Sequence, residues 1–148
     1  MPHTNQKWGP MTDVEVVVSA YGAAWLDVDE AERRRLLAVA WSEDGVYQDP
    51  TADVSGREAL AQHIAGFRQR VPGFTIIVTS GVDHHHGKLH FLWKMVGPDG
   101  QTTLEGRDFG ELDQDGRIAR IVGFFGAPPA RADVAAKGAA ISTIDKSI

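Results

Sequence analysis

The stretch TTLEGRDFGEL, residues 102–112, decides the fold class of this chain. Its even positions carry small or apolar side chains and one aspartate, whereas Glu105, Arg107 and Glu111 form a charged odd-numbered face. This period of two is typical of a β-strand with one buried face. Three similar runs, rich in β-branched and aromatic residues, accompany it: FTIIVTSGV (74–82), KLHFLWKMV (88–96) and RIARIVGFF (117–125). The turn-forming separators DHHHG, GPDGQ and DQDG predict an antiparallel meander.

The residues before the meander show helical rather than strand periodicity. Three start signals with an acidic residue three positions later open segments that end at helix-breaking sequences: Thr12 with Glu15 to about Leu26, Asp29 with Glu32 to Asp44-Gly45, and Ser55 with Glu58 to Pro72-Gly73. A short extended piece, Val46 to Gln48, ends at Asp49-Pro50. Helices followed by strands predict an α+β domain over residues 12–126, with three helices on one face of a curved antiparallel sheet. Residues 1–11 are expected to form an N-terminal arm and residues 127–148 an Ala-rich tail.

Length and composition exclude several classes of protein. The 148 residues suffice for one domain, and 43% hydrophobic with 24% charged residues is typical of a globular core. A net charge of -5 disfavours a nucleic-acid partner. Because no run of 18 apolar residues and no secretory signal is visible, we expect a soluble cytoplasmic protein without membrane contact. With no cysteine, any chemistry must use carboxylates, histidine, tyrosine or a bound cofactor.

Several strands are apolar on both faces, which leaves one sheet face to be covered. In residues 88–96, Leu89, Phe91, Trp93 and Met95 share one side, while Leu92 and Val96 share the other. No further amphipathic helix of comparable strength remains to cover the second face. We therefore expect a homodimer formed through the outer sheet face.

Three polar side chains fall on positions that the pattern predicts to be buried: Tyr21 in the first helix, Asp49 before Pro50, and Asp108 in the third long strand. A carboxyl group on an apolar face has either a raised pKa or a charged partner. A purely structural role remains open for each of them. Tyr21 could bind a backbone carbonyl, Asp49 could cap a turn, and Asp108 could be turned outward by a bulge to pair with Arg107 or Arg117.

Together these features resemble the cone-shaped nuclear transport factor two-like fold, and within it the SnoaL-like polyketide cyclases and ketosteroid isomerases. The resemblance covers residues 12–126 and rests on the Asp-Pro pair, the S-G-x-E helix start, G-x-D in the third strand and D-x-D-G-R-I after it. It implies a cone-shaped α+β barrel with a mixed edge. It also implies that Asp49 is the general base, and that Tyr21 and a protonated Asp108 donate hydrogen bonds to the substrate oxygen, as in ketosteroid isomerase.

The first functional hypothesis is thus an enzyme without cofactor that isomerises or cyclises an apolar ketone or polyketide-like substrate by proton transfer next to its carbonyl. His63, on the inner face of the third helix, would assist or orient, and would also suit a dehydratase-like site. The aromatic and apolar residues expected to line the cone are Trp25, Trp41, Tyr47, Phe67, Trp93, Ile121 and Phe125.

The alternative hypothesis is a non-catalytic module of the same fold that binds an apolar ligand or forms a dimeric partner domain. The enzyme needs Asp108 neutral and Asp49 ionised near pH 7, whereas the binding module allows both to be ionised and paired with arginines. No metal site is expected, because the adjacent residues His84, His85 and His86 point alternately on a predicted solvated turn. The sequence Asp113 to Gly116 is interpreted as a hairpin turn.

Overall fold

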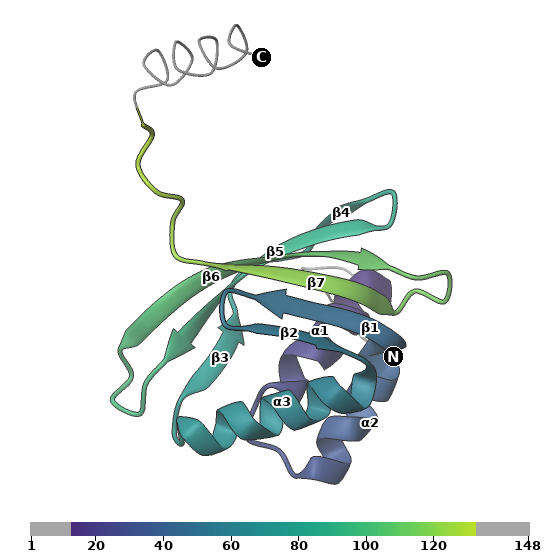
Figure 1. Ribbon diagram of the computed structural model, residues 1–148, viewed down its shortest axis with the longest axis horizontal. Coiled ribbons are helices and arrows are strands. Elements are labelled where there is room, and N and C mark those ends of the chain that lie inside the picture. Colours follow the sequence, from purple (N-terminus) through teal and green to yellow (C-terminus); the bar gives the residue numbers. More distant parts are fainter. Residues whose placement is uncertain (1–12, 133–148) are drawn as a thin grey trace, which may run out of the picture.

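A computed structural model of the protein describes residues 13–132, and it has helices on one face of a curved sheet (Figure 1). The helices are α1 (Asp13–Ala24), α2 (Glu30–Ala40) and α3 (Arg57–Arg70). The strands are β1 (Trp41–Asp49), β2 (Ala52–Ser55), β3 (Thr75–Val78), β4 (Asp83–His85), β5 (Lys88–Val96), β6 (Thr102–Leu112) and β7 (Ile118–Phe125). This α+β architecture confirms the fold class expected from the sequence.

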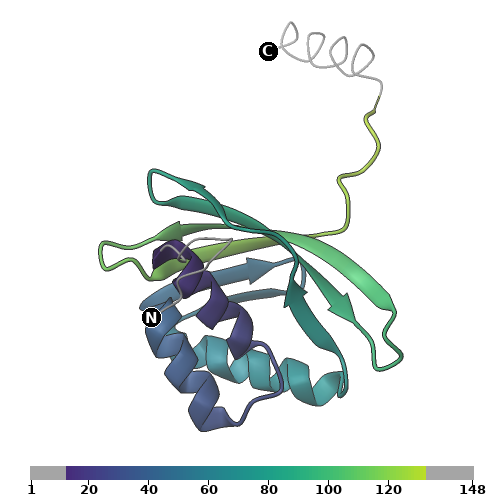
Figure 2. The same ribbon diagram turned by 180° about the vertical axis from the view of Figure 1, so that it is seen from behind.

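The sheet has the strand order β2-β1-β7-β6-β5-β3, and β4 pairs with β5 beside this path (Figure 2). Strands β5, β6 and β7 form the expected antiparallel meander, whereas β1 and β7 run parallel and make the sheet mixed. In the register of this meander Asp108 lies between Phe91 on β5 and Gly123 on β7. The centre of the meander therefore carries the one buried carboxylate of β6 on the face toward the helices.

The second helix is shorter than the sequence predicts, because β1 takes its last residues. Helix α2 ends at Ala40, and the segment from Trp41 onward is extended rather than helical. The indole of Trp41 lies across Gly45, where a Cβ atom would approach the ring to 2.5 Å. Arg57 of α3 also donates two hydrogen bonds to the Trp41 carbonyl, at 2.6 and 2.9 Å. Pairing with β7 and burial of the ring override the local helical periodicity.

Two further local predictions, a helix cap and a turn, are also corrected. Ser55 does not cap α3, because it pairs with Val46 as the last residue of β2, and Gly56, with φ 98°, is the N-cap without a side-chain hydrogen bond. His84 and His85 belong to strand β4 rather than to a turn, and the reversal is made at His86 and Gly87, both at positive φ. Strand β2 escaped the sequence pattern because its four residues are too few to show a period.

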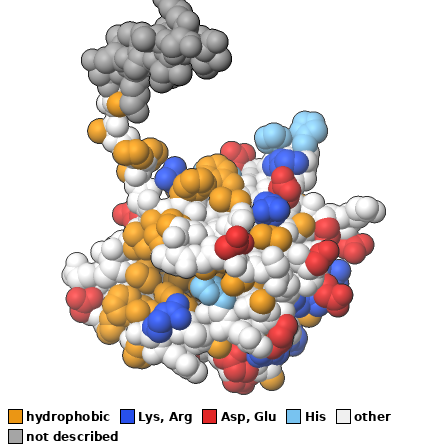
Figure 3. Space-filling model, viewed as in Figure 1, with side chains coloured by type: hydrophobic (Ala, Val, Ile, Leu, Met, Phe, Trp, Pro, Cys, Tyr) orange, Lys and Arg blue, Asp and Glu red, His pale blue; other side chains and the backbone are white. Residues whose placement is uncertain are grey.

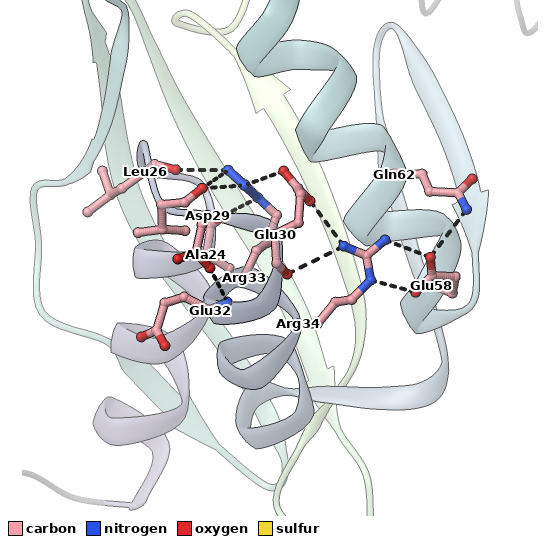
Figure 4. A network of polar contacts seen from close by, with 10 residues as sticks. Ala24, Leu26, Asp29, Glu30, Glu32, Arg33, Arg34, Glu58 and Gln62 are labelled. Carbon is pink, nitrogen blue, oxygen red and sulfur yellow. Dashed lines mark hydrogen bonds and ion pairs between the residues drawn. The ribbon is translucent and has the colours of Figure 1, made fainter.

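A buried arginine joins α1 to α2 (Figure 4). Asp29 caps α2 as predicted, accepting a hydrogen bond from the Glu32 amide at 2.8 Å. Arg33, 1% exposed, donates from its guanidinium to the carbonyls of Ala24, Leu26 and Val28 at 3.1 to 3.2 Å. The Leu26 carbonyl also accepts from the Val28 amide at 2.9 Å, whereas Arg33 is the side-chain donor to the carbonyls of Ala24 and Val28. This clamp of Arg33 on the α1–α2 connection fixes the last turn of α1, which carries Tyr21, and the loop that follows it.

The ends of the expected domain are described only in part. Thr12, the predicted first cap, and the N-terminal arm lie outside the described residues, as do residues 133–148 of the predicted tail. Residues 127–132 form neither helix nor strand. Within residues 13–132, no helix has the length and apolar character needed to span a bilayer.

Candidate active site

A cavity of about 210 Å³ lies between the helices and the inner face of the sheet. Hydrophobic side chains gather beside a histidine and a basic side chain on the face where α3, β3 and β2 meet (Figure 3). Most of the lining is aromatic or aliphatic, from Trp25, Tyr47, Phe67, Ile76, Val78, Phe91, Trp93, Met95, Leu104 and Phe125. The polar residues among this apolar lining are Tyr21, Asp49, Thr51, His63, Arg70 and Asp108. An apolar cavity with a few convergent polar groups is the usual form of a small-molecule site.

Asp108 is the most deeply buried acid of the cavity, with 5% of its surface exposed. Its position on β6 follows from the strand alternation, which places Asp108 on the inner face between Gly106 and Gly110. Its Oδ1 atom accepts a hydrogen bond from Trp93 Nε1 at 3.1 Å, and no arginine or lysine of the described residues forms an ion pair with it. Burial raises the pKa of Asp108 to about 7, Trp93 lowers it in part, and the charge of Asp49 raises it.

Two glycines make room for this carboxyl group and its partner. At Gly106 a Cβ atom would lie 2.1 Å from the Trp93 ring, so only glycine lets the indole lie flat across β6. At Gly123 a Cβ atom would lie 2.8 Å from Asp108 Oδ1. The G-x-D spacing in β6 therefore has a steric cause, since the first glycine seats the indole that donates to the aspartate.

Asp49 ends β1 and is held in place from both sides of its carboxylate. The Tyr47 hydroxyl donates to Oδ2 at 2.5 Å, and the amide and hydroxyl of Thr51 donate to Oδ1 at 2.7 and 2.8 Å. Asp49 thus has the structural role of capping the β1–β2 turn, and it also lines the cavity. The pKa of the Tyr47 hydroxyl is raised, first by burial, then by Tyr21 and Asp49. Tyr47 therefore stays protonated as a donor to the carboxylate.

Tyr21 lies on the inner face of α1, 3% exposed, with its ring stacked on Trp41 at 5.5 Å. Burial raises the pKa of its hydroxyl well above 10.0, and the charges of Asp108 and Asp49 raise it further. The indole of Trp25 lowers the pKa of the Tyr21 hydroxyl in part, although Trp25 Nε1 makes no hydrogen bond within the described residues. Tyr21 is therefore a neutral hydrogen-bond donor close to both carboxyl groups.

His63 lies on the cavity side of α3, half-buried against Trp25 and Tyr47, with ring centroids 6.0 and 5.6 Å away. Burial lowers its pKa, Asp49 raises it, and Arg70 lowers it. A net decrease from 6.5 leaves the imidazole neutral at pH 7, so that one ring nitrogen can accept a proton and the other can donate one.

Most of the residues selected from the sequence lie together in this cavity. The four proposed catalytic residues line it, as do Trp25, Tyr47, Phe67, Trp93 and Phe125. Trp41 and Ile121 do not, which corrects their assignment: both are 0% exposed in the core, Trp41 beneath Tyr21 and Ile121 against Gly110. The sequence reading missed Arg70 and Thr51. The spacing of seven residues between His63 and Arg70 would have pointed to the arginine.

No metal centre is evident among the described residues, since residues 13–132 contain no group of three or more His, Asp or Glu side chains placed to hold an ion. His85 and His86 contact each other on the exposed β4–β5 hairpin, away from the cavity.

Comparison with solved structures identifies relatives of the fold. "A putative isomerase of the SnoaL-like family" from Agrobacterium tumefaciens is 33% identical, with a TM-score of 0.73 over 79% of this chain and 100% of that one. A "putative SnoaL-like polyketide cyclase" from Jannaschia sp. CCS1 is 17% identical, with a TM-score of 0.61 over 84% and 99%. An NTF2-like protein of unknown function from Exiguobacterium sp. 255-15 is 16% identical, with a TM-score of 0.60 over 79% and 100%.

No functionally curated protein sequence matches the chain. The family model of the SnoaL-like domain matches residues 23–121, which run from the end of α1 into β7 and include most of the residues that line the cavity. Together with the NTF2-like architecture and the 33% identical relative, this match establishes the family. The chain belongs to the SnoaL-like family.

Proposed function

We propose that the chain is a cofactor-independent enzyme that moves a proton at the carbon next to the carbonyl of a small apolar ketone or polyketide-like substrate, leading to isomerisation or cyclisation. One observation carries the proposal. Asp108 is a buried carboxyl group that has no cationic partner within residues 13–132, its pKa is raised to about 7, and it lies in the same apolar cavity as Tyr21 and Asp49. A carboxylic acid that is partly neutral at pH 7 can donate a hydrogen bond where negative charge develops.

The proposed reaction begins with removal of a proton. Asp49 accepts the proton from the carbon next to the carbonyl, and the electron pair of that C–H bond moves to form an enolate. The hydroxyl of Tyr21 and the protonated carboxyl of Asp108 donate hydrogen bonds to the enolate oxygen. Return of the proton from Asp49 to another carbon gives the isomer. Attack of the enolate carbon on a second carbonyl instead forms the carbon–carbon bond of a ring, and the alkoxide oxygen produced takes up the proton held by Asp49.

Three further groups support Asp49 in this scheme. Tyr47 and Thr51 fix the orientation of the carboxylate through three hydrogen bonds, which reduces the reorganisation needed before proton transfer. Neutral His63 packs against Tyr47, and the charge of Asp49 raises the pKa of the imidazole in part. In the proposed scheme His63 relays the proton or orients the substrate.

The proposal is tested with cyclohex-3-en-1-one, whose isomerisation to the conjugated enone is followed by ultraviolet absorbance, and with exchange of its α-protons in D2O followed by NMR. We expect the wild-type protein to accelerate both. Asp49→Asn should reduce the rate about 100-fold or more, because it removes the base. Asp108→Leu should reduce it about 100-fold, because it removes one donor to the enolate oxygen.

Asp53→Asn is the matched control, since Asp53 is an exposed carboxylate of the same hairpin that does not line the cavity. It should leave the rate unchanged. Binding of the ketone with no acceleration above the buffer rate by the wild-type protein would instead favour a ligand-binding module, and would sink the catalytic proposal.

We also propose that two copies pair through the outer face of the sheet. Leu92, Phe109 and Phe124 lie on neighbouring strands of that face with 41 to 46% of their surfaces exposed. Phe109 stacks on His90 with centroids 4.4 Å apart and contacts Phe124 at 6.0 Å, and Arg107 of the same face lies over the Phe124 ring at 5.4 Å. Exposed aromatic side chains that cluster around one cation on a sheet face favour a symmetric partner.

A further inference from the structure

The cavity face of α3 continues beyond its aromatic residues to a cation. His63, Phe67 and Arg70 are spaced by four and three residues, and all three line the cavity. This spacing places them on one side of the helix. Arg70 is exposed at the last turn, so it lies where the cavity meets solvent.

The two arginines at the end of α3 differ in what they bind. Arg68 donates from Nη1 to the Phe74 carbonyl at 2.5 Å, which ties the helix to the loop before β3. Arg70 has no hydrogen bond or ion pair with any residue that the structure describes. Both complement the helix dipole at its C-terminus, so that role does not explain why one of them lines the cavity.

The guanidinium of the exposed Arg70 approaches its own helix one turn before the end. A Cβ atom at Gly66, one turn earlier, would lie 3.3 Å from Arg70 Nη1. The guanidinium therefore lies beside the turn of α3 that carries Phe67, and both side chains line the cavity. A small residue at position 66 leaves room for this arrangement.

Arg70 is the one cationic side chain among the described lining residues. Burial lowers the pKa of His63, and the positive charge of Arg70 lowers it further. The polar groups are thus arranged with the cation exposed at the end of α3 and the partly neutral Asp108, 5% exposed, within the sheet. A guanidinium without a protein partner is suited to bind a carboxylate through two parallel hydrogen bonds.

We infer that the substrate is a keto acid: an apolar ring fills the cavity, the carbonyl faces Tyr21 and Asp108, and a carboxylate binds Arg70 at the mouth. The carbonyl part rests on the function proposed above, whereas the carboxylate part rests on Arg70 alone. The carboxylate would then act as a handle that orients the ring with its carbonyl inward.

The test compares two ligands of nearly the same shape that differ in charge, 4-oxocyclohexanecarboxylate and the neutral 4-oxocyclohexanecarboxamide. Their binding to the full chain is measured by NMR titration. We expect wild type to bind the carboxylate about tenfold more tightly, which is the low end for a hydrogen-bonded charged group because Arg70 is exposed. In Arg70→Met the two ligands should bind equally. Arg70→Lys should keep part of the preference, and added salt should weaken it.

Arg35→Met is the control, since Arg35 is an exposed arginine whose one ion pair in the part of the chain that the structure describes is with Glu32 on α2. It should retain the full preference for the carboxylate. Equal binding of the two ligands by wild type, a preference that survives Arg70→Met, or no saturable binding of the carboxylate would each overturn the inference.

Proton exchange of the same two ligands separates this inference from the proposed function. Arg70-dependent binding of the carboxylate without exchange would contradict the catalytic proposal and leave the anion site standing. Exchange of neutral ketones without any preference for the carboxylate would contradict the keto-acid inference alone.

Discussion

A carboxyl group in an apolar wall makes folding depend on its protonation. The pKa of Asp108 is about 7 in the folded protein, against 3.8 for an ordinary aspartate, so the folded state binds its proton more tightly than the unfolded state. Between these two values, the free energy of unfolding therefore falls as the pH rises. Burial of Asp108 in the cavity therefore lowers the free energy of unfolding at neutral pH.

Asp108→Asn should remove this pH dependence, because the amide does not ionise. We expect the variant to be more stable than wild type at pH 8, by up to about 4 kcal/mol for a shift of this size. The difference should shrink as the pH falls from about 7 toward 3.8, and below 3.8 Asp108 is protonated in both states. Urea unfolding across this range measures it, and equal stabilities of the two proteins at pH 8 would show that Asp108 is not destabilised by its burial.

Trp93 offers a second test at the residue scale. Its indole N–H favours the ionised form of Asp108, so Trp93→Phe should raise the pKa of Asp108 above about 7. In the proposed mechanism activity falls as Asp108 loses its proton, and this fall should move to higher pH in the variant. A purely packing role for Trp93 would lower the activity at every pH but leave the midpoint of the fall in place.

At the scale of elements, one side chain holds the α1–α2 connection together. Arg33→Met would keep much of the volume but remove the side-chain donor from the carbonyls of Ala24 and Val28, and leave Leu26 with the Val28 amide alone. We expect a loss of about 2 to 4 kcal/mol in the free energy of unfolding, since each unpaired buried group is costly. Arg35 lies two residues further along α2 on its exposed face, so Arg35→Met should change the free energy of unfolding by less than about 1 kcal/mol. Urea midpoints that shift equally in both variants would contradict the clamp.

The elements also show where local sequence and tertiary packing disagree. The residues after Ala40 continue a helical pattern, yet they form β1 because Trp41 packs over Gly45 and the strand gains two neighbours, β2 and β7. Hydrogen bonding to strands distant in the sequence outweighs a local helical preference of this size.

At the scale of the whole molecule, the cluster of exposed aromatic side chains on the outer sheet face predicts association. Wild type should sediment as a dimer at micromolar concentration, and Phe109→Lys together with Phe124→Glu should give a folded monomer. Val39→Glu, a change of an exposed apolar residue on α2 away from this face, should leave the dimer intact. A wild-type monomer under these conditions would contradict the proposed pairing.

The sequence by itself determined the α+β class, the β5–β6–β7 meander and the inward position of Asp108. These depend on periodicity, and a strand with one buried face repeats every two residues whatever surrounds it. The same local patterns located Tyr21 and His63 on the inner faces of their helices.

Only the tertiary structure decided which of these residues share a cavity. Trp41 and Ile121 are as apolar as Trp25 and Phe125, yet two lie in the core and two line the cavity, because that difference depends on which element packs above each ring. Arg70 became visible as a functional candidate for the same reason. Helical spacing puts Arg70 and His63 on the same side of α3, but whether that side lines a cavity depends on how α3 packs over the sheet, which no local pattern records.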